Sequence, residues 1–275
     1  MYAGAMHFPA PVDASVRNDQ APWNKFDNKA YVAQNYLDLL PADAEILSMV
    51  GSHFSRHFEN RGEGAGSPVL GIDMGAGGNL YPALAMLPWC RRITLFERAP
   101  ENIEYLRKQR DRMDQNWDAF WKVLCHEKVY ADLDSKWKND FRDVARVEQG
   151  NLFKMGRRNR LGFRRSAGKY QIGTMFFVAE SISTSLDEFQ QAVDCFMSVL
   201  APGAPFAAAF MEGSRGYDVG DEHFPACDVD KEQVENALAP YARKPEMVRL
   251  SDADHLVRPG HTGMILACGV RRSGK

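Results

Sequence analysis

The chain has 275 residues, a formal net charge of −2 and an isoelectric point near 6.4. This near-neutral balance argues against a dedicated nucleic-acid binder, and no apolar run approaches the roughly 18 residues that span a bilayer. The first 20 residues lack the basic start and apolar core of a secretory signal. The length fits one large domain with elaborations.

The five cysteines are scattered along the chain, odd in number and without a Cys-x-x-Cys pair. This pattern is typical of free thiols in a reducing compartment, and it argues against a zinc site. We therefore expect a cytoplasmic protein that binds no metal.

Residues 23–58 are expected to be helical, because apolar side chains recur there at helical spacing. The segment Pro41-Ala42-Asp43 marks the start of the second helix. A polar, glycine-rich tract at 61–67 is interpreted as a linker. We therefore divide the chain into an N-terminal arm with a helical cover, residues 1–66, and a larger domain, residues 67–275.

The stretch 69–81 runs from an apolar strand through Asp73 and a glycine turn into a helix. This is the first unit of a doubly wound α/β sheet, in which the free amides of the helix suit a ligand. A dinucleotide fingerprint would place a small residue at the sixth position counted from Gly75, but Leu80 stands there. An acid before the glycines favours a ligand with cationic or hydroxyl groups, such as S-adenosylmethionine, over a diphosphate. A structural turn without a ligand is the alternative.

Apolar runs along the rest of the chain predict further strands at 92–97, 144–149, 172–178, 205–211, 247–250 and 262–270. Helical patterns separate the first five strands, and a last helix is expected at 229–241. The alternation predicts a Rossmann-like, doubly wound α/β fold with a seven-stranded sheet, mostly parallel with an antiparallel last strand. The tract 212–217 is expected to be a flexible loop.

Ligands of such sheets bind beyond the carboxyl ends of the parallel strands. Five polar residues stand at these ends: Asp73, Glu97, Asn151, Glu180 and Glu212. Glu97 follows Asp73 by 24 residues, close to the interval at which nucleoside-binding folds place an acid on the ribose hydroxyls. The amide of Asn151 could pair with an adenine edge or simply form a turn.

A basic tract between Lys154 and Lys169 is the one feature that could suit a nucleic acid. It lacks the interleaved aromatic residues on which bases stack, so we interpret it as a solvated loop.

Several motifs together resemble the family of nicotinamide, phenylethanolamine and indolethylamine N-methyltransferases. Residues 26–36 are similar to the family's N-terminal cover motif, residues 72–81 to its cofactor loop, and residues 186–192 with 200–203 to its fourth helix and exit. The resemblance covers residues 23–270. It implies a class I methyltransferase that uses S-adenosylmethionine and releases S-adenosylhomocysteine.

The resemblance also implies which residues contact the cofactor: Trp23, Tyr31, Tyr36, Asp73, Gly75, Gly77, Asn79, Tyr81, Glu97, Arg98, Asn102, Asn151 and Leu152. Three of these positions depart from the family pattern. Glu97 stands where an aspartate is usual, Arg98 where an aromatic residue often stacks on adenine, and Asn151 where an aspartate binds the adenine edge. Arg98 could stack through its guanidinium plane instead.

The acceptor site is the part that the sequence leaves open. By resemblance, Glu180 and Glu212 lie where the phenylethanolamine enzyme has acids near its substrate amine, and either could hold an ammonium or take its proton. Tyr36 is expected to contact the substrate as well as the cofactor. Arg258 would instead suit a carboxylate acceptor, and His261 a hydroxyl for which it is the base. A salt-bridged glutamate, a surface arginine and a capped histidine are the plain alternatives.

Three functions follow from these patterns. Methylation of a nitrogen in a small, aromatic or amine-bearing metabolite is slightly favoured. The alternatives are O-methylation of a carboxylate or hydroxyl of a natural product, and a non-catalytic module that binds the cofactor. Both enzymatic hypotheses predict a monomer with a small-molecule substrate. They predict that neither a membrane nor a nucleic acid is a partner.

Overall fold

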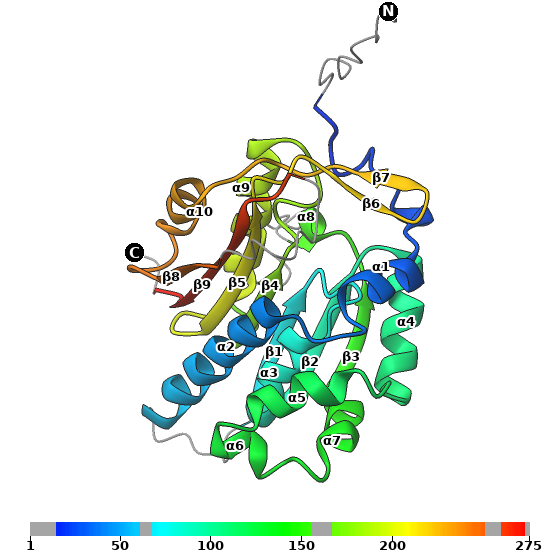
Figure 1. Cartoon of the computed structure of the whole chain (residues 1–275). Helices are drawn as coiled ribbons and strands as arrows, with labels where there is room; N and C mark the ends of the chain where they lie inside the picture. Colours follow the sequence, from blue (N-terminus) through cyan, green and yellow to red (C-terminus); the bar gives the residue numbers. More distant parts are fainter. Residues whose placement is uncertain (1–14, 61–67, 156–166, 251–259, 273–275) are drawn as a thin grey trace, which may run out of the picture.

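The computed structural model describes residues 15–60, 68–155, 167–250 and 260–272. A seven-stranded sheet with helices on both faces forms its centre (Figure 1). The strands of this sheet are β1 (Val69–Met74), β2 (Cys90–Glu97), β3 (Ala145–Gln149), β4 (Ile172–Phe176), β5 (Pro205–Glu212), β8 (Glu246–Leu250) and β9 (Gly263–Val270).

The strand order is β3-β2-β1-β4-β5-β9-β8. Strands β1 to β5 pair in parallel, whereas β9 runs antiparallel to both β5 and β8. The predicted fold class is therefore confirmed. The chain reverses its direction of winding between β1 and β4, and the crevice at such a switch point is where ligands of doubly wound sheets bind.

The helices cover the sheet and one side of this crevice (Figure 1). They are η1 (Trp23–Lys25), α1 (Asn28–Asn35), α2 (Pro41–Asn60), α3 (Tyr81–Met86), η2 (Leu87–Trp89), α4 (Pro100–Asp111), α5 (Trp117–Leu124), α6 (Lys128–Ala131), α7 (Trp137–Val144), α8 (Leu152–Met155), α9 (Leu186–Val199) and α10 (Lys231–Leu238). No helix within the described ranges is long and apolar enough to cross a membrane.

Local chemistry sets where several helices begin. Pro100 occupies the first turn of α4, where its missing N–H is not needed. The Ser185 hydroxyl accepts from the Glu188 amide at the start of α9. At α10, Asp230 and Gln233 form a reciprocal capping box, so this helix begins two residues later than the predicted 229.

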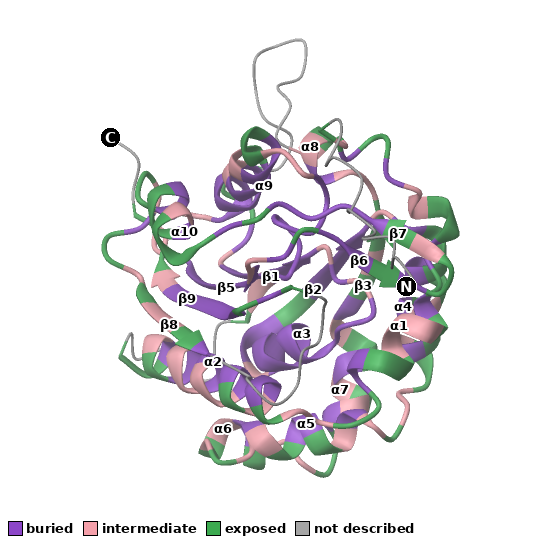
Figure 2. Cartoon of the chain, turned by 45° about the horizontal axis from the view of Figure 1, so that its top comes forward, coloured by how far each residue is buried: buried purple, intermediate pink, exposed green. Residues whose placement is uncertain are grey.

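Two apolar cores lie on the two faces of the sheet. One contains buried residues of α2, α3, α5 and α7, and the other contains those of α9 and α10. Figure 2 shows α3 buried throughout, whereas α2, α9 and α10 carry both buried and exposed residues. In α2, Phe54 and Phe58 pack on Trp89, with ring centroids 6.2 and 5.1 Å apart. Helix α2 thus shares a core with the sheet, and the boundary at 66/67 stays a prediction.

Two segments differ from the sequence predictions. Strand β4 ends at Phe176 rather than at 178, because Phe177 has a left-handed backbone with a φ of 58°. The loop predicted through residue 217 instead ends in a β-hairpin of β6 (Tyr217–Val219) and β7 (Glu222–Phe224). Gly220, with a φ of 59°, provides the positive φ that a two-residue hairpin turn requires.

We expect Phe54→Ala to lower the free energy of unfolding by about 3–5 kcal/mol, because it removes a fully buried ring from the core that α2 shares with the sheet. Urea denaturation followed by circular dichroism measures this loss. Leu37→Ala is the control, since Leu37 is 58% exposed, and it should change stability by about 0.5 kcal/mol or less. A similarly small effect of Phe54→Ala would mean that α2 unfolds as an independent cover.

Candidate active site

The main cavity lies at the carboxyl ends of β1 to β4 and has a volume of about 730 Å³. Its floor is the glycine turn after β1. The amides of Gly75 and Ala76 both donate to the carbonyl of Phe96, at 2.7 and 3.1 Å, which ties the turn to β2. Gly75 and Gly77 have φ values of 74° and 54°, a conformation that favours glycine.

The glycines also make room. A Cβ on Gly75 would lie 2.5 Å from the Val178 side chain, so a larger residue would force the turn away from β4. A Cβ on Gly77 would meet nothing within 3.6 Å, because Gly77 faces the cavity. The backbone of Gly77 is therefore open to the cavity, where it can contact the polar chain of a ligand.

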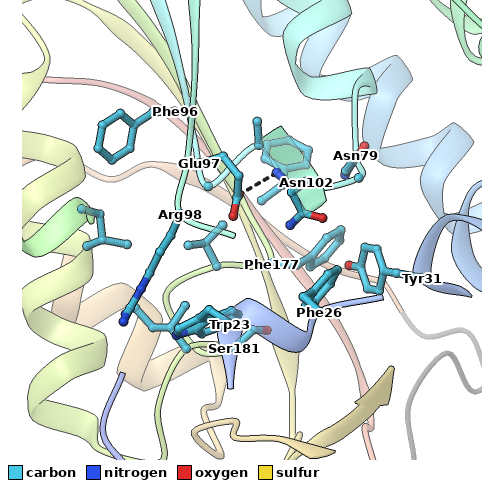
Figure 3. A pocket seen from close by; sticks show the side chains of 18 of the residues that line it. Trp23, Phe26, Tyr31, Asn79, Phe96, Glu97, Arg98, Asn102, Phe177 and Ser181 are labelled. Carbon is cyan, nitrogen blue, oxygen red and sulfur yellow. Dashed lines mark hydrogen bonds between the residues drawn. The ribbon is translucent and has the colours of Figure 1, made fainter. Parts of the chain in front are cut away.

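Glu97 and Asn102 point into this cavity from the end of β2 and from α4 (Figure 3). The carboxylate of Glu97 accepts hydrogen bonds from the Ala99 amide at 2.7 Å and the Gly77 amide at 3.0 Å. The Asn102 carbonyl oxygen accepts from the Asn28 side-chain amide at 2.7 Å, which leaves the Asn102 amino group as a donor. A carboxylate beside an amide donor suits vicinal hydroxyls of a ribose.

Asp73 lies beneath the turn rather than among the residues that line the cavity. It is buried, and its Oδ1 accepts from the Thr174 hydroxyl at 2.7 Å. Burial and, less strongly, the charge of Glu97 raise the pKa of its carboxyl group to about 7, against the lowering effect of the Thr174 hydrogen bond. Its Oδ2 has no hydrogen-bond partner among the residues that the structure describes. Such a group suits a cationic ligand.

The far end of the cavity is lined by Phe96, Arg98, Asn151 and Leu152. The side-chain oxygen of Asn151 accepts from the Phe153 amide at 2.9 Å, so this residue also begins α8. The Arg98 guanidinium lies 5.8 Å from the centre of the Trp23 ring and donates to the Asn18 side chain at 2.7 Å. In this arrangement Arg98 stacks on Trp23.

Aromatic residues of the N-terminal segment and of the hairpin form the roof of the cavity. Phe224 of β7 contacts both Trp23 and Phe26, with ring centroids 5.4 and 5.1 Å apart, and Phe26 in turn contacts Tyr31 at 5.2 Å. The segment before η1 is fixed to α9, because the Asn18 amide donates to Glu188 at 2.8 Å. Two distant parts of the chain therefore close the same site.

A second, smaller cavity of about 290 Å³ adjoins the first. Three aromatic residues line both cavities: Tyr31, Tyr36 and Phe177. Phe177 has a left-handed φ of 58°, which costs a bulky residue about 1–3 kcal/mol. The second cavity is also lined by Asn35, Leu40, Asp43, Met211 and Met264.

Most residues predicted to contact the cofactor line the main cavity: Trp23, Tyr31, Tyr36, Gly75, Gly77, Asn79, Glu97, Arg98, Asn102, Asn151 and Leu152. Asp73 and Tyr81 do not. The Tyr81 ring is fully buried and stacks on Phe120 with centroids 5.7 Å apart, and its hydroxyl donates to Asp43. Tyr81 therefore packs behind the residues that line the main cavity.

Of the residues predicted for the acceptor, Tyr36 lines both cavities, whereas Glu180, Glu212 and His261 line neither. Glu180 is fully buried, and its Oε1 accepts from the Met211 amide and the Ser181 hydroxyl. Glu212 accepts from Arg249 at 2.6 Å, which lowers the pKa of its carboxyl group. His261 is buried, and Arg258 lies outside the described residues.

Several lining residues were missed by the sequence reasoning: Asn18, Phe26, Asp43, Phe177 and Tyr217. The hairpin that carries Tyr217 had a signal, since Gly220-Asp221 between alternating residues is a two-residue turn pattern. Asp43 was interpreted only as a helix start. Nothing in the sequence marks Phe177 as left-handed.

Three solved structures with a similar fold are methyltransferases. The N-methyltransferase NodS from Bradyrhizobium japonicum WM9, solved with S-adenosylhomocysteine, has a TM-score of 0.50 at 12% identity, covering 90% of this chain and 100% of that one. An S-adenosylmethionine-dependent methyltransferase from Methanosarcina mazei has a TM-score of 0.51 at 10% identity, covering 86% and 100%. The CurJ carbon methyltransferase has a TM-score of 0.50 at 11% identity, covering 88% and 58%. These likenesses establish the fold.

Comparison with curated proteins gives no match. The model of the NNMT/PNMT/TEMT family matches residues 15–267, which include the roof, the glycine turn and the strands that bear the site. The chain therefore belongs to the NNMT/PNMT/TEMT family, and it is a methyltransferase that uses S-adenosylmethionine.

Proposed function

We propose that this enzyme methylates a nitrogen of a small, aromatic or amine-bearing metabolite. The observation that carries the proposal is the second cavity, which opens beside the cofactor cavity and shares three aromatic residues with it. Aromatic faces attract cations, so a wall of this kind favours an amine and its methylated product.

The main cavity has the groups that S-adenosylmethionine needs, and bound there it would supply an electrophilic methyl group. Glu97 and Asn102 would hold the ribose hydroxyls, and the open backbone at Gly77 would lie along the methionine part. Buried Asp73, with its unpartnered oxygen, would favour the cationic amino group. The aromatic roof would exclude water and align the reacting atoms, which is the main demand of an in-line methyl transfer.

Two alternatives are weaker. O-methylation was suggested by Arg258 and His261, of which the first lies outside the described residues and the second is buried. A non-catalytic module is disfavoured by membership of a methyltransferase family. We further propose that the enzyme acts as a cytoplasmic monomer, an inference from its composition and its scattered free cysteines.

A methyl-transfer panel tests the proposal directly. With radiolabelled S-adenosylmethionine, we expect label to enter aromatic primary and secondary amines, and not phenols or carboxylic acids of the same skeletons. Transfer only to phenols or acids would contradict N-methylation, and transfer to none of the panel would contradict a small aromatic acceptor.

Replacing the ribose acid should weaken cofactor binding. We expect Glu97→Ala to reduce the affinity for S-adenosylhomocysteine by about tenfold or more, because hydrogen bonds to a charged group contribute about 1.5–3 kcal/mol. Isothermal titration calorimetry measures the affinity, and circular dichroism checks that the fold survives the loss of the Gly77 and Ala99 contacts. Glu101→Ala, in the exposed first turn of α4, is the matched control and should bind like the wild type.

Cofactor affinity should depend on the ionisation of Asp73. The pKa of this carboxyl group is about 7 in the free protein, and a bound cation lowers it by favouring the carboxylate. Binding must then release a proton below pH 7, so the affinity should fall as the pH falls below about 7, by up to about tenfold per unit, and stay level above it. Calorimetry with S-adenosylhomocysteine between pH 5.5 and 8.5 gives the profile. Asp73→Asn should flatten it, and an unchanged slope in that variant would exclude Asp73.

A further inference from the structure

The segment that leads into η1 connects two sides of the main cavity. Its Val16 pairs with Thr184, which follows β4: the Val16 amide donates to the Thr184 hydroxyl at 2.9 Å, and the Thr184 amide donates to the Val16 carbonyl at 3.0 Å. Further along the segment, Trp23 lines the cavity beside Arg98, which follows β2 (Figure 3). We call residues 16–23 the strap, because they link the segment after β4 to the end of β2.

Asn18 is the residue through which the strap is held. It is only 3% exposed. One guanidinium nitrogen of Arg98 donates to both oxygens of Asn18, to the carbonyl at 2.8 Å and to the side-chain oxygen at 2.7 Å. The Trp23 indole donates to the same two oxygens at 2.8 and 3.1 Å. The Asn18 amide donates to Glu188 at 2.8 Å. Each oxygen thus accepts two hydrogen bonds, which fills its two lone pairs.

Charged groups hold the strap from both sides. Glu188, in the first turn of α9, is buried and also accepts from Arg17 of the strap at 3.1 Å. On the other side, burial lowers the pKa of the Arg98 guanidinium, and the charges of nearby carboxylates, Asp19 and Glu97 among them, oppose this effect. Arg98 keeps its charge in a protein. Hydrogen bonds that involve a charged group are roughly twice as strong as neutral ones, so both attachments are strong.

The strap lies at the end of the main cavity where we place the adenosine part of the cofactor. Asn18, Trp23 and Arg98 all line the cavity, and Arg98 directly follows Glu97, the proposed ribose acid. Glu188, in contrast, is not among the described residues that line this cavity. A change at Glu188 therefore loosens the strap without removing a group that faces the cofactor.

We propose that Arg98 and Glu188 are positioning residues that hold the strap across the adenosine end of the main cavity, and that opening of the strap limits the exchange of S-adenosylhomocysteine. This inference rests on the proposed position of the cofactor and is independent of the acceptor. Arg98 suits this role better than the aromatic residue often found at its position in the family, because a phenyl ring can stack but cannot donate to Asn18.

A strap that gates the cavity affects binding rates differently from a direct contact. Loss of a direct contact changes mainly the dissociation rate. When the cofactor can enter and leave only while the strap is open, a larger open fraction raises the association rate as well as the dissociation rate. The two rates therefore distinguish a gate from a simple binding contact.

Surface plasmon resonance with the immobilised full chain measures both rates for S-adenosylhomocysteine, without methyl transfer. We expect Glu188→Ala to raise the dissociation rate by about tenfold or more and the association rate by about threefold or more, because the strap loses its charged anchor on α9. Asp187→Ala changes the adjacent, exposed residue of the same helical turn. It is the matched control and should leave both rates unchanged.

Hydrogen exchange shows whether the strap itself opens. The amides of residues 16–23 should exchange faster in Glu188→Ala than in the wild type, whereas those of the central strands should not, because only the strap is released. Thermal unfolding checks that the fold persists.

Arg98→Phe loosens the strap from the side of β2. The phenyl ring keeps a face on which adenine can stack but removes the donors to Asn18, so strap exchange and cofactor dissociation should both become faster. Arg92→Phe, at an exposed position of β2, is the control and should leave both unchanged. Wild-type exchange of the strap in Arg98→Phe would refute the role of Arg98.

The rates also decide against the inference in other ways. If Glu188→Ala opens the strap but leaves both rates unchanged, or raises the dissociation rate alone, the strap is not a gate. Failure of the wild type to bind S-adenosylhomocysteine would refute the cofactor position and this inference together. The choice between N- and O-methylation is tested by the acceptor panel alone, so that proposal can fail while the role of the strap stands.

Discussion

The carboxylate of Glu97 is the contact on which the geometry of the cofactor cavity depends. It accepts from the amide of Gly77 in the turn after β1 and from the amide of Ala99 before α4. These two turns form neighbouring sides of the cavity, and one buried side chain holds them together. Loss of this contact would leave the buried amide of Ala99 without an acceptor, a cost of about 1–3 kcal/mol, and would release the half-buried amide of Gly77.

The identity of this residue then has a structural reason. An aspartate, the usual residue in the family that the sequence resembles, is one methylene shorter. The longer Glu97 bridges both turns while its side chain still reaches the cavity. Each carboxylate oxygen has a second lone pair, so accepting an amide does not prevent it from accepting a hydroxyl. The same group can thus set the shape of the site and bind a ligand in it.

The gathering of polar residues around the main cavity was predictable because its determinants are local in sequence. The glycine turn, Glu97 and Asn102 lie at fixed distances after successive strands, and parallel strands bring their carboxyl ends to one edge. The whole sheet followed from the same alternation of strands and helices. The exact end of β4 did not, because the left-handed conformation of Phe177 is imposed by its surroundings rather than by its own preference.

The second cavity, where we propose that the acceptor binds, was harder to predict because it combines residues far apart in the chain. Its wall comes from α1, α2, the segment after β4, β5 and β9, and no short motif encodes such a meeting. The resemblance directed attention to Glu180 and Glu212. Glu212 is the last residue of β5, as predicted, whereas Glu180 lies beyond the end of β4 at Phe176, and the two side chains bind Met211 and Arg249. Position in a motif fixes where a Cα lies; it does not fix which neighbour the side chain binds.

This division has a consequence for how the enzyme is built. The cofactor groups sit on the rigid central strands, while the roof of Trp23, Phe26 and Phe224 comes from the N-terminal segment and the hairpin. The N-terminal segment and the hairpin contact each other through these aromatic rings. The second cavity adjoins the main one, and Tyr36 and Phe177 line both. If the acceptor binds there, as we propose, changes in the cover alter the acceptor while the glycine turn and Glu97 keep the methyl donor unchanged.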